Sequence, residues 1–409
     1  MYKIIEKGSV TSPKGFQASG IVAGLKRSGK PDMALIVSEA PAKVSGAFTA
    51  NKFAAAPVQY DREIVDAREP VRAIIVNSGN ANACTGAPGR RDAEAMAAAV
   101  AARLQLAPAE VLVSSTGRIG VPMPMGIILA GIEKACGALS RDGGLTASEA
   151  IITTDTYAKP YAVSVEIGGR TITIGGCAKG AGMIAPKLVG PKCEATMLAY
   201  LTTDAAVSQD FLDWCLAQSL DQSFNRVTVD GDTSTNDTFL VLANGLAGNP
   251  ELQKGTPEAA AFAEAFNAVA GHLARELVLD GEGVTRFVEL TVTGAKSDAD
   301  ARRAAEAIAN SALCKTAWFG ADPNWGRVLC AAGYSGIDFN PDQVNLDYEG
   351  IPVVRGGRDA GTPESTLSKA INVRKFRIDL DLGSGPGRFT IWTCDLTYEY
   401  VKINADYHT

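Results

Sequence analysis

The sequence predicts an α+β fold with a smaller C-terminal α/β domain, and three observations lead to this prediction. The chain has 409 residues, which corresponds to two or three domains of ordinary size. Hydrophobic residues make up 46% of the chain and charged residues 21%, as in globular proteins rather than in disordered or coiled-coil ones. Strand-like and helix-like segments are interleaved without the regular rhythm of a doubly wound sheet.

The first half of the chain alternates short apolar runs with turn residues, a pattern that predicts strands. Two further β-rich runs flank Gly168 and Gly169, which indicates a hairpin. Helices are expected at residues 91–104, which are rich in alanine, and at 126–135. The predicted strands are residues 33–37, 47–49, 58–60, 71–76 and 111–114, and the hairpin covers residues 161–174.

Helices dominate the middle of the second half. An apolar stripe with i, i+3, i+4 spacing favours a helix at residues 209–220. Thr256 as the cap and Pro257 as the first helical residue open a second helix, which is expected to end near residue 279. The turn-rich residues 281–283 mark the expected start of the C-terminal domain, residues 284–409. A third helix is predicted at 297–309, and strands at 196–202, 287–292, 344–348, 376–380 and 389–396.

Charge and hydropathy exclude several classes of partner. The formal net charge is −6, from 39 basic and 45 acidic residues, so the chain has no basic field to attract nucleic acid or an anionic membrane. No apolar run approaches the roughly 20 residues that cross a bilayer, and residues 1–10 lack the apolar core of a signal peptide. The eight cysteines are scattered without a Cys-x-x-Cys pair, which favours reduced thiols in a cytoplasmic protein.

Histidine is scarce. The chain contains only His272 and His408, so a histidine-centred triad or a multi-histidine metal site is nearly excluded by counting. We therefore expect no metal, and acid–base chemistry must use another group.

Four segments are rich in glycine and small polar residues, as expected of loops that bind a small molecule. Tight turns would explain the same composition, because glycine and asparagine also satisfy turn geometry. No segment carries a nucleotide-binding fingerprint. The four segments are residues 77–86, 114–117, 230–237 and 322–327.

The sharpest feature is a threonine that follows a glycine-rich segment containing Lys179. Cleavage after Ala195 would leave Thr196 with both an attacking hydroxyl and a free α-amine that can act as its base. Taken alone, Thr196 is better explained as a β-branched residue at the start of a strand.

Eight segments, in order along essentially the whole chain, resemble the ornithine acetyltransferase family of arginine biosynthesis. Members of this family are glutamate N-acetyltransferases that recycle an acetyl group. The resemblance implies a layered α/β sandwich of the self-processing aminopeptidase/ornithine acetyltransferase type. The matching segments are residues 77–86, 114–117, 153–156, 179–186, 195–198, 230–237, 280–283 and 322–327.

The resemblance implies autocatalytic cleavage between Ala195 and Thr196. The products would be an N-terminal chain, residues 1–195, and a C-terminal chain, residues 196–409, which stay associated as a heterotetramer with two copies of each. Thr196 would take the acetyl group from N2-acetyl-L-ornithine, releasing ornithine, and L-glutamate would accept it. No cofactor is implied, although a bifunctional member would also use acetyl-CoA as a donor.

The resemblance also assigns individual residues. Thr116 and Gly117 correspond to the oxyanion-stabilising pair, a role that suits a hydroxyl and a backbone N–H. The C-terminal residues would fold back over the site. With histidine so scarce, the α-amine of Thr196 is the expected general base. The implied substrate-binding residues are Thr153, Lys179, Thr196, Glu282, Asn404 and Thr409.

One departure from the family lies just before the cleavage pair, where six residues from Val189 to Glu194 look inserted. Self-cleavage is expected to need a strained scissile peptide, and a longer loop would relax that strain. Cys193 is a candidate second nucleophile, but it has no histidine partner in the pattern.

Two other functions remain open from the sequence. An aminopeptidase or amidase on the same self-processing fold would let water resolve the acyl-enzyme, so that acetate is released instead of acetylglutamate. A non-catalytic amino-acid-binding protein, with maturation blocked by the insertion, would run as a single band after denaturation.

Overall fold

The computed structural model describes residues 1–185 and 197–406, which form two compact units. Of the described residues, the first unit contains Met1–Asn225 and Asp232–Leu277, and the second contains Arg226–Gly231 and residues 278–406. Each unit has its own sheet and its own hydrophobic core. The predicted cleavage pair, Ala195 and Thr196, lies outside the described residues.

The first unit is built on a sheet in which nine strands are described. Its order is β1-β6-β7-β8-β9-β3-β4-β5, and β2 pairs with β3 beside this path. Parallel pairing joins β4 to β5 and β8 to β9, so the carboxyl ends of β4 and β5 lie at the same edge. The strands are β1 (Tyr2–Ile4), β2 (Phe16–Ile21), β3 (Met33–Phe48), β4 (Val71–Asn80), β5 (Val111–Arg118), β6 (Lys159–Ile167), β7 (Arg170–Lys179), β8 (Leu198–Thr203) and β9 (Thr238–Ala243).

The long strand β3 connects two parts of this sheet. Its first half pairs with β2 and β4, and its second half pairs with β9. The register with β4 shifts between Val37 and Ala42, a stretch that contains Pro41. Proline has no N–H to donate to a ladder, which fits its place at this irregularity. One strand can therefore belong to both parts of a layered α+β structure.

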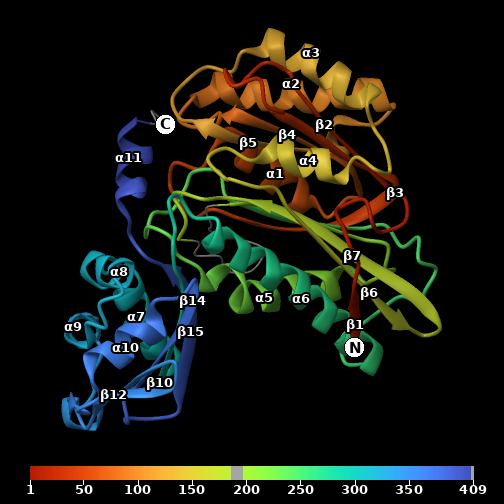
Figure 1. Ribbon diagram of the computed structural model, residues 1–409. Coiled ribbons are helices and arrows are strands. Elements are labelled where there is room, and N and C mark those ends of the chain that lie inside the picture. Colours follow the sequence, from red (N-terminus) through yellow and green to blue (C-terminus); the bar gives the residue numbers. More distant parts are fainter. Residues whose placement is uncertain (186–196, 407–409) are drawn as a thin grey trace. The chain divides into compact units, whose positions relative to one another are not determined.

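Helices cover both parts of the sheet. Figure 1 shows α2 and α3 side by side near β2, β4 and β5, and α5 next to α6. Phe211 of α5 packs against Phe262 of α6 with ring centroids 5.9 Å apart. The helices are α1 (Ala56–Ala67), α2 (Gly86–Leu104), α3 (Met125–Gly137), α4 (Gly144–Ile151), α5 (Gln209–Gln222) and α6 (Pro257–Leu279), whose last two residues belong to the second unit; a 3-10 turn, η1, covers Pro108–Glu110 and another, η2, covers Phe224–Arg226.

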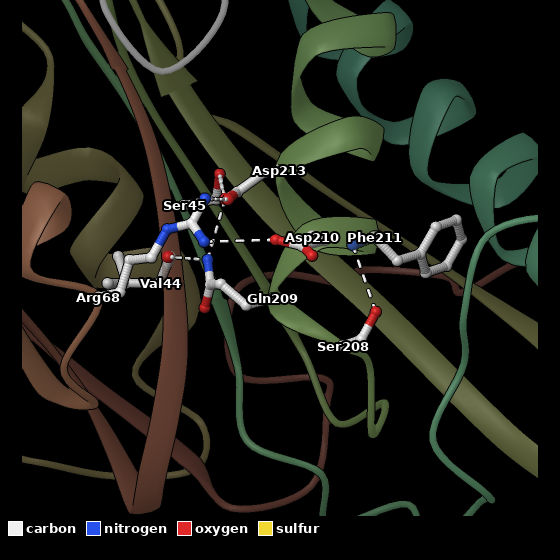
Figure 2. A network of polar contacts seen from close by, with 8 residues as sticks. All are labelled: Val44, Ser45, Arg68, Ser208, Gln209, Asp210, Phe211 and Asp213. Atoms are coloured by element: carbon white, nitrogen blue, oxygen red, sulfur yellow. Dashed lines mark hydrogen bonds and ion pairs between the residues drawn. The ribbon is translucent and has the colours of Figure 1, made fainter.

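Charged and polar side chains fix the start of α5 against β3 (Figure 2). Ser208 caps the helix, because its hydroxyl accepts a hydrogen bond from the Phe211 N–H. Asp213, one turn later, accepts hydrogen bonds from the Ser45 hydroxyl at 2.7 Å and from Arg68 at 2.9 Å. Because Arg68 ends α1, one carboxylate ties two helices to a strand.

The second unit has a six-stranded sheet of order β13-β12-β11-β14-β10-β15, with β10 parallel to β14 and antiparallel to β15. Its strands are β10 (Phe287–Ala295), β11 (Asn345–Tyr348), β12 (Ile351–Arg355), β13 (Arg358–Asp359), β14 (Lys375–Asp381) and β15 (Gly387–Cys394). Its helices are α7 (Asp298–Ala309), α8 (Ala312–Phe319), α9 (Trp325–Gly333), α10 (Glu364–Ile371) and α11 (Tyr398–Asp406), and η3 covers Pro341–Gln343. No helix among the described residues is long and apolar enough to cross a membrane.

The strongest sequence signals correspond to observed elements. The helices predicted at 209–220, 257–279 and 297–309 are α5, α6 and α7, and the hairpin predicted at 161–174 is formed by β6 and β7. The strand predicted at residues 58–60 is wrong, because these residues belong to α1. Pro57 lies in the first turn of α1, and the buried residues of α1 recur at helical spacing. Three residues are too few to show that spacing.

The prediction of loops at two of the glycine-rich segments is also wrong in part. β4 continues to Asn80 and β5 continues to Arg118, so residues 77–80 and 114–117 are paired strand residues rather than turns. Polar residues favour turns in a sequence pattern, yet the side chains of Asn77, Ser78 and Ser115 form hydrogen bonds inside the protein. Residues 322–324 do precede a helix, but Trp325 already begins α9.

Candidate active site

The carboxyl ends of β4 and β5 form the frame of the candidate site. Ser78 pairs with Thr116, and Gly79 pairs with Gly117, in parallel register. A Cβ on Gly117 would lie 2.4 Å from the Gly79 carbonyl carbon, and Gly117 has φ +131°, so both space and backbone conformation require glycine here. The predicted oxyanion residues Thr116 and Gly117 therefore lie on a closely packed, well-defined edge.

Buried asparagine side chains form hydrogen bonds with the backbone near this edge. The Asn77 side chain accepts a hydrogen bond from the Ser115 hydroxyl at 2.6 Å and donates one to the Asn80 carbonyl at 2.8 Å. Asn236 donates to the carbonyls of Ala81 and Ser115 at 2.6 and 2.8 Å. Asn77 and Asn236 lie in the polar segments that the sequence indicated, and their role here is to support backbone rather than to face a ligand.

Lys179, at the end of β7, connects two threonines of the candidate site. Its ammonium donates to the Thr153 hydroxyl oxygen at 3.0 Å and lies 3.3 Å from the Thr116 hydroxyl oxygen. Lys179 is buried. A hydroxyl that accepts from an ammonium keeps its own proton available for donation. Three residues predicted from separate segments of the sequence therefore converge.

Asp155 organises the loop beside Lys179, although the sequence analysis did not single it out as a site residue. Its carboxylate accepts from the Lys159 ammonium and the Gly180 N–H, both at 2.7 Å, and from the Thr153 N–H at 3.1 Å. The ion pair with Lys159 is fully buried. Burial opposes ionisation, but the positive charges of Lys159 and Lys179 outweigh it and lower the pKa of Asp155 to about 2.

The predicted nucleophile Thr196, its neighbour Ala195, Thr409 and the additional residues 189–194 lie outside the described residues. The described chain resumes at Met197, and β8 begins at Leu198, which pairs with Lys179 on one side and with Thr238 on the other. The strand that follows position 196 therefore begins beside Lys179.

Two predicted substrate-binding residues belong to the second unit and contact each other there. Asn404, on α11, donates to the Glu282 carboxylate at 2.7 Å and to the Tyr400 carbonyl at 3.0 Å. Glu282 is buried, and the following Gly283 has φ +68° with Thr397 packed against it, so glycine is required at that turn. The sequence prediction thus links two residues that are more than 100 positions apart and that the fold brings into contact.

The described part of the chain contains no group of three or more His, Cys, Asp or Glu side chains arranged to hold a metal ion. His272 lies on α6 and stacks on Tyr161, with ring centroids 3.8 Å apart. His408 lies outside the described residues.

Comparison with known proteins decides the family. The sequence model described as the ArgJ family matches residues 17–409. The chain belongs to the ArgJ family. It is 48% identical to the arginine biosynthesis bifunctional protein ArgJ of Symbiobacterium thermophilum over 98% of this chain and 99% of that protein. It is 49% identical to the protein of the same name from Geobacter sulfurreducens over 97% of this chain and 99% of that one.

A structure of a similar protein has also been solved. A chain of ornithine acetyltransferase complexed with ornithine, from Mycobacterium tuberculosis, is 41% identical to this protein. The alignment covers 46% of this chain and 100% of that chain, with a TM-score of 0.43.

Proposed function

We propose that this protein transfers an acetyl group from N2-acetyl-L-ornithine to L-glutamate in arginine biosynthesis, through an acetyl-Thr196 enzyme. The observation that carries the proposal is its similarity, over nearly its whole length, to proteins named arginine biosynthesis bifunctional protein ArgJ. The word bifunctional in those names supports a second reaction, in which acetyl-CoA donates the acetyl group to glutamate. We also propose a cytoplasmic location, which the scattered cysteines favour.

Maturation comes first. Cleavage of the Ala195–Thr196 peptide releases the α-amine of Thr196, which then accepts the proton of the Thr196 hydroxyl during attack. The hydroxyl oxygen bonds to the acetyl carbonyl carbon of acetylornithine and forms a tetrahedral oxyanion. Collapse of this intermediate breaks the C–N bond, and the ornithine amine leaves with the proton. Glutamate's amine then attacks the acetyl ester, and the Thr196 oxygen recovers a proton.

The described residues support particular roles in these steps. Thr116, which accepts from Lys179, has its hydroxyl proton available for the oxyanion, and the Gly117 N–H is the second donor that we assign. Lys179 and Thr153 are assigned to the substrate, as are Glu282 and Asn404. The buried Asp155–Lys159 pair keeps the 153–155 loop in place beside Lys179.

The decisive experiment is the mass of the purified protein and its variants. We expect two chains, with Thr196 at the amino terminus of the second, and an increase by one acetyl group on that chain after incubation with acetylornithine. Thr196→Ala should remain a single chain and should carry no acetyl group. An amino terminus elsewhere, or full turnover by Thr196→Ala, would exclude Thr196 as the nucleophile.

The same preparation separates this proposal from the aminopeptidase or amidase alternative. With acetylornithine and glutamate present, an acetyltransferase yields N-acetylglutamate, whereas a hydrolase yields acetate in equal amount to ornithine. The similarity to ArgJ proteins favours the first outcome.

A further inference from the structure

Asn236, a buried residue just before β9, holds the backbone on both sides of the predicted oxyanion pair, residues 116–117. Its side-chain amide donates to the carbonyl of Ser115, the residue before the pair, at 2.8 Å. The same amide donates to the Ala81 carbonyl at 2.6 Å. The Ala81 N–H in turn donates to the carbonyl of Arg118, the residue after the pair, at 2.9 Å. One side chain therefore fixes both ends of the oxyanion pair.

The orientation of the Asn236 amide follows from its partners. A carbonyl oxygen can only accept a hydrogen bond, so the amide nitrogen must face both carbonyls. The side-chain oxygen of Asn236 accepts from the Thr235 hydroxyl at 2.6 Å. Both N–H donors of the amide are therefore used, and a carboxylate of the same shape would supply neither of them.

The backbone that carries Asn236 continues into the strand beside β8. Thr238 begins β9, and its N–H donates to the Met197 carbonyl at 2.8 Å. Met197 directly follows the predicted nucleophile in the sequence. The Thr238 hydroxyl donates to the Asn236 carbonyl at 3.0 Å, which fixes the conformation between these two residues. Residues 236–238 therefore connect the oxyanion pair to the start of the nucleophile strand, β8.

We propose that Asn236 is a positioning residue for acetyl transfer, which keeps the start of β8 in place relative to the oxyanion donors. The inference rests on the proposed function, because it needs Thr196 as the nucleophile and residues 116–117 as the donors. In the sheet, β8 and β5 are separated by β9, β3 and β4. Asn236 reaches from the segment before β9 directly to β5, so it shortens this chain of contacts.

The test compares two buried asparagines at opposite ends of the same two strands. Because β8 and β9 are parallel, Asn236 lies where they start and Asn249 lies beyond their ends. Asn249 also donates to two carbonyls, those of Ala206 at 3.0 Å and Pro250 at 2.7 Å. Asn249→Ala is the matched control, since each alanine variant leaves two carbonyls without their side-chain donor.

In Asn236→Ala and Asn236→Asp, kcat per cleaved chain should fall by on the order of 10²-fold with little change in KM, the effect of misplacing reacting groups by about 1 Å. Asn236→Asp keeps the shape of the side chain and removes only its two donors. Self-cleavage uses the same threonine and should also be slower in both variants. Asn249→Ala should lose as much stability in urea denaturation as Asn236→Ala, yet keep the wild-type kcat and rate of cleavage.

Two kinetic results would overturn the proposal. Equal falls in kcat for the two alanine variants would show a general effect of lost stability, and a wild-type kcat in Asn236→Asp would show that the two donors do not matter.

A wild-type protein that forms no acetyl-enzyme would contradict the proposed function instead, and hydrogen–deuterium exchange then tests Asn236 separately. Exchange in Asn236→Ala should rise in the peptides that contain residues 115–118 and 197–200, whereas in Asn249→Ala it should rise around residue 206. Unchanged exchange at both peptides in Asn236→Ala would show that Asn236 does not hold them in place.

Discussion

At the scale of single residues, the hydroxyl of Thr116 carries the most specific chemical prediction. It lies at the end of β5, 3.3 Å from the Lys179 ammonium, and next to a glycine whose conformation the neighbouring strand enforces. A hydroxyl fixed in this way costs little reorganisation when negative charge develops on the substrate.

Thr116→Val should therefore lower kcat by roughly 10²- to 10³-fold with a smaller change in KM, because it removes the oxyanion donor and keeps the β-branched shape. Thr116→Ser retains the hydroxyl and should stay within about tenfold of wild type. Steady-state kinetics of both variants check this. If the valine variant keeps the wild-type kcat, Thr116 is a strand residue without a catalytic role.

The role of Asp155 beside the candidate site could not be predicted from the sequence, since an aspartate in a threonine-rich turn looks like an ordinary turn former. Only the fold shows that it neutralises a buried lysine. Because its pKa is lowered, the stability it contributes is present above the usual carboxyl pKa near 4 and is lost as the pH falls toward about 2.

Asp155→Asn should reduce the free energy of unfolding at pH 7 by about 3–5 kcal/mol, because Lys159 loses its buried carboxylate partner. The difference from wild type should shrink as the pH approaches 2. Urea denaturation at several pH values measures this, with the exposed Asp142→Asn as control. The double variant Asp155→Asn with Lys159→Met should recover part of the loss, and no recovery would argue against the ion pair as the cause.

At the scale of elements, the junction of α1, β3 and α5 shows how one polar side chain positions secondary structure (Figure 2). Asp213 and Asp210 are on the same helix and both contact Arg68. They differ in exposure, because the Asp213 side chain is 17% exposed and the Asp210 side chain 89% exposed. Asp213 also accepts from the Ser45 hydroxyl, which is buried.

Asp213→Ala should cost about 1–3 kcal/mol of unfolding free energy, because it leaves the buried Ser45 hydroxyl without its acceptor. Asp210→Ala removes only an exposed ion pair and should change stability by less than about 1 kcal/mol. Chemical denaturation of the two variants gives the comparison. Equal effects would show that the contact with Arg68, which both share, dominates the junction.

At the scale of the whole molecule, the prediction concerns assembly. The resemblance implies a heterotetramer in which the N-terminal and C-terminal chains each occur twice. Native mass spectrometry should therefore give twice the summed mass of one chain of each kind, and denaturation should release two species. Thr196→Ala serves as the control, because it should assemble as two uncleaved chains. A native mass of one chain of each kind would exclude the tetramer.

The sequence alone predicted the family, the helices α5, α6 and α7, and the grouping of Thr116, Gly117, Thr153 and Lys179 in one candidate site. These features depend on local pattern and on motifs that can be read residue by residue. They can be predicted without knowing which helices and strands pack against each other.

The tertiary structure decided the rest. Residues 58–60 are helical because their buried face extends across α1, and residues 77–80 and 114–117 are strands because Asn77 and Asn236 satisfy polar groups that a sequence pattern assigns to turns. The hydrogen bond from the Gly180 N–H to Asp155 and the packing of Leu25 over Gly79 depend on segments distant in the chain. Burial and charge neutralisation act between neighbours in space, and a linear pattern does not contain those neighbours.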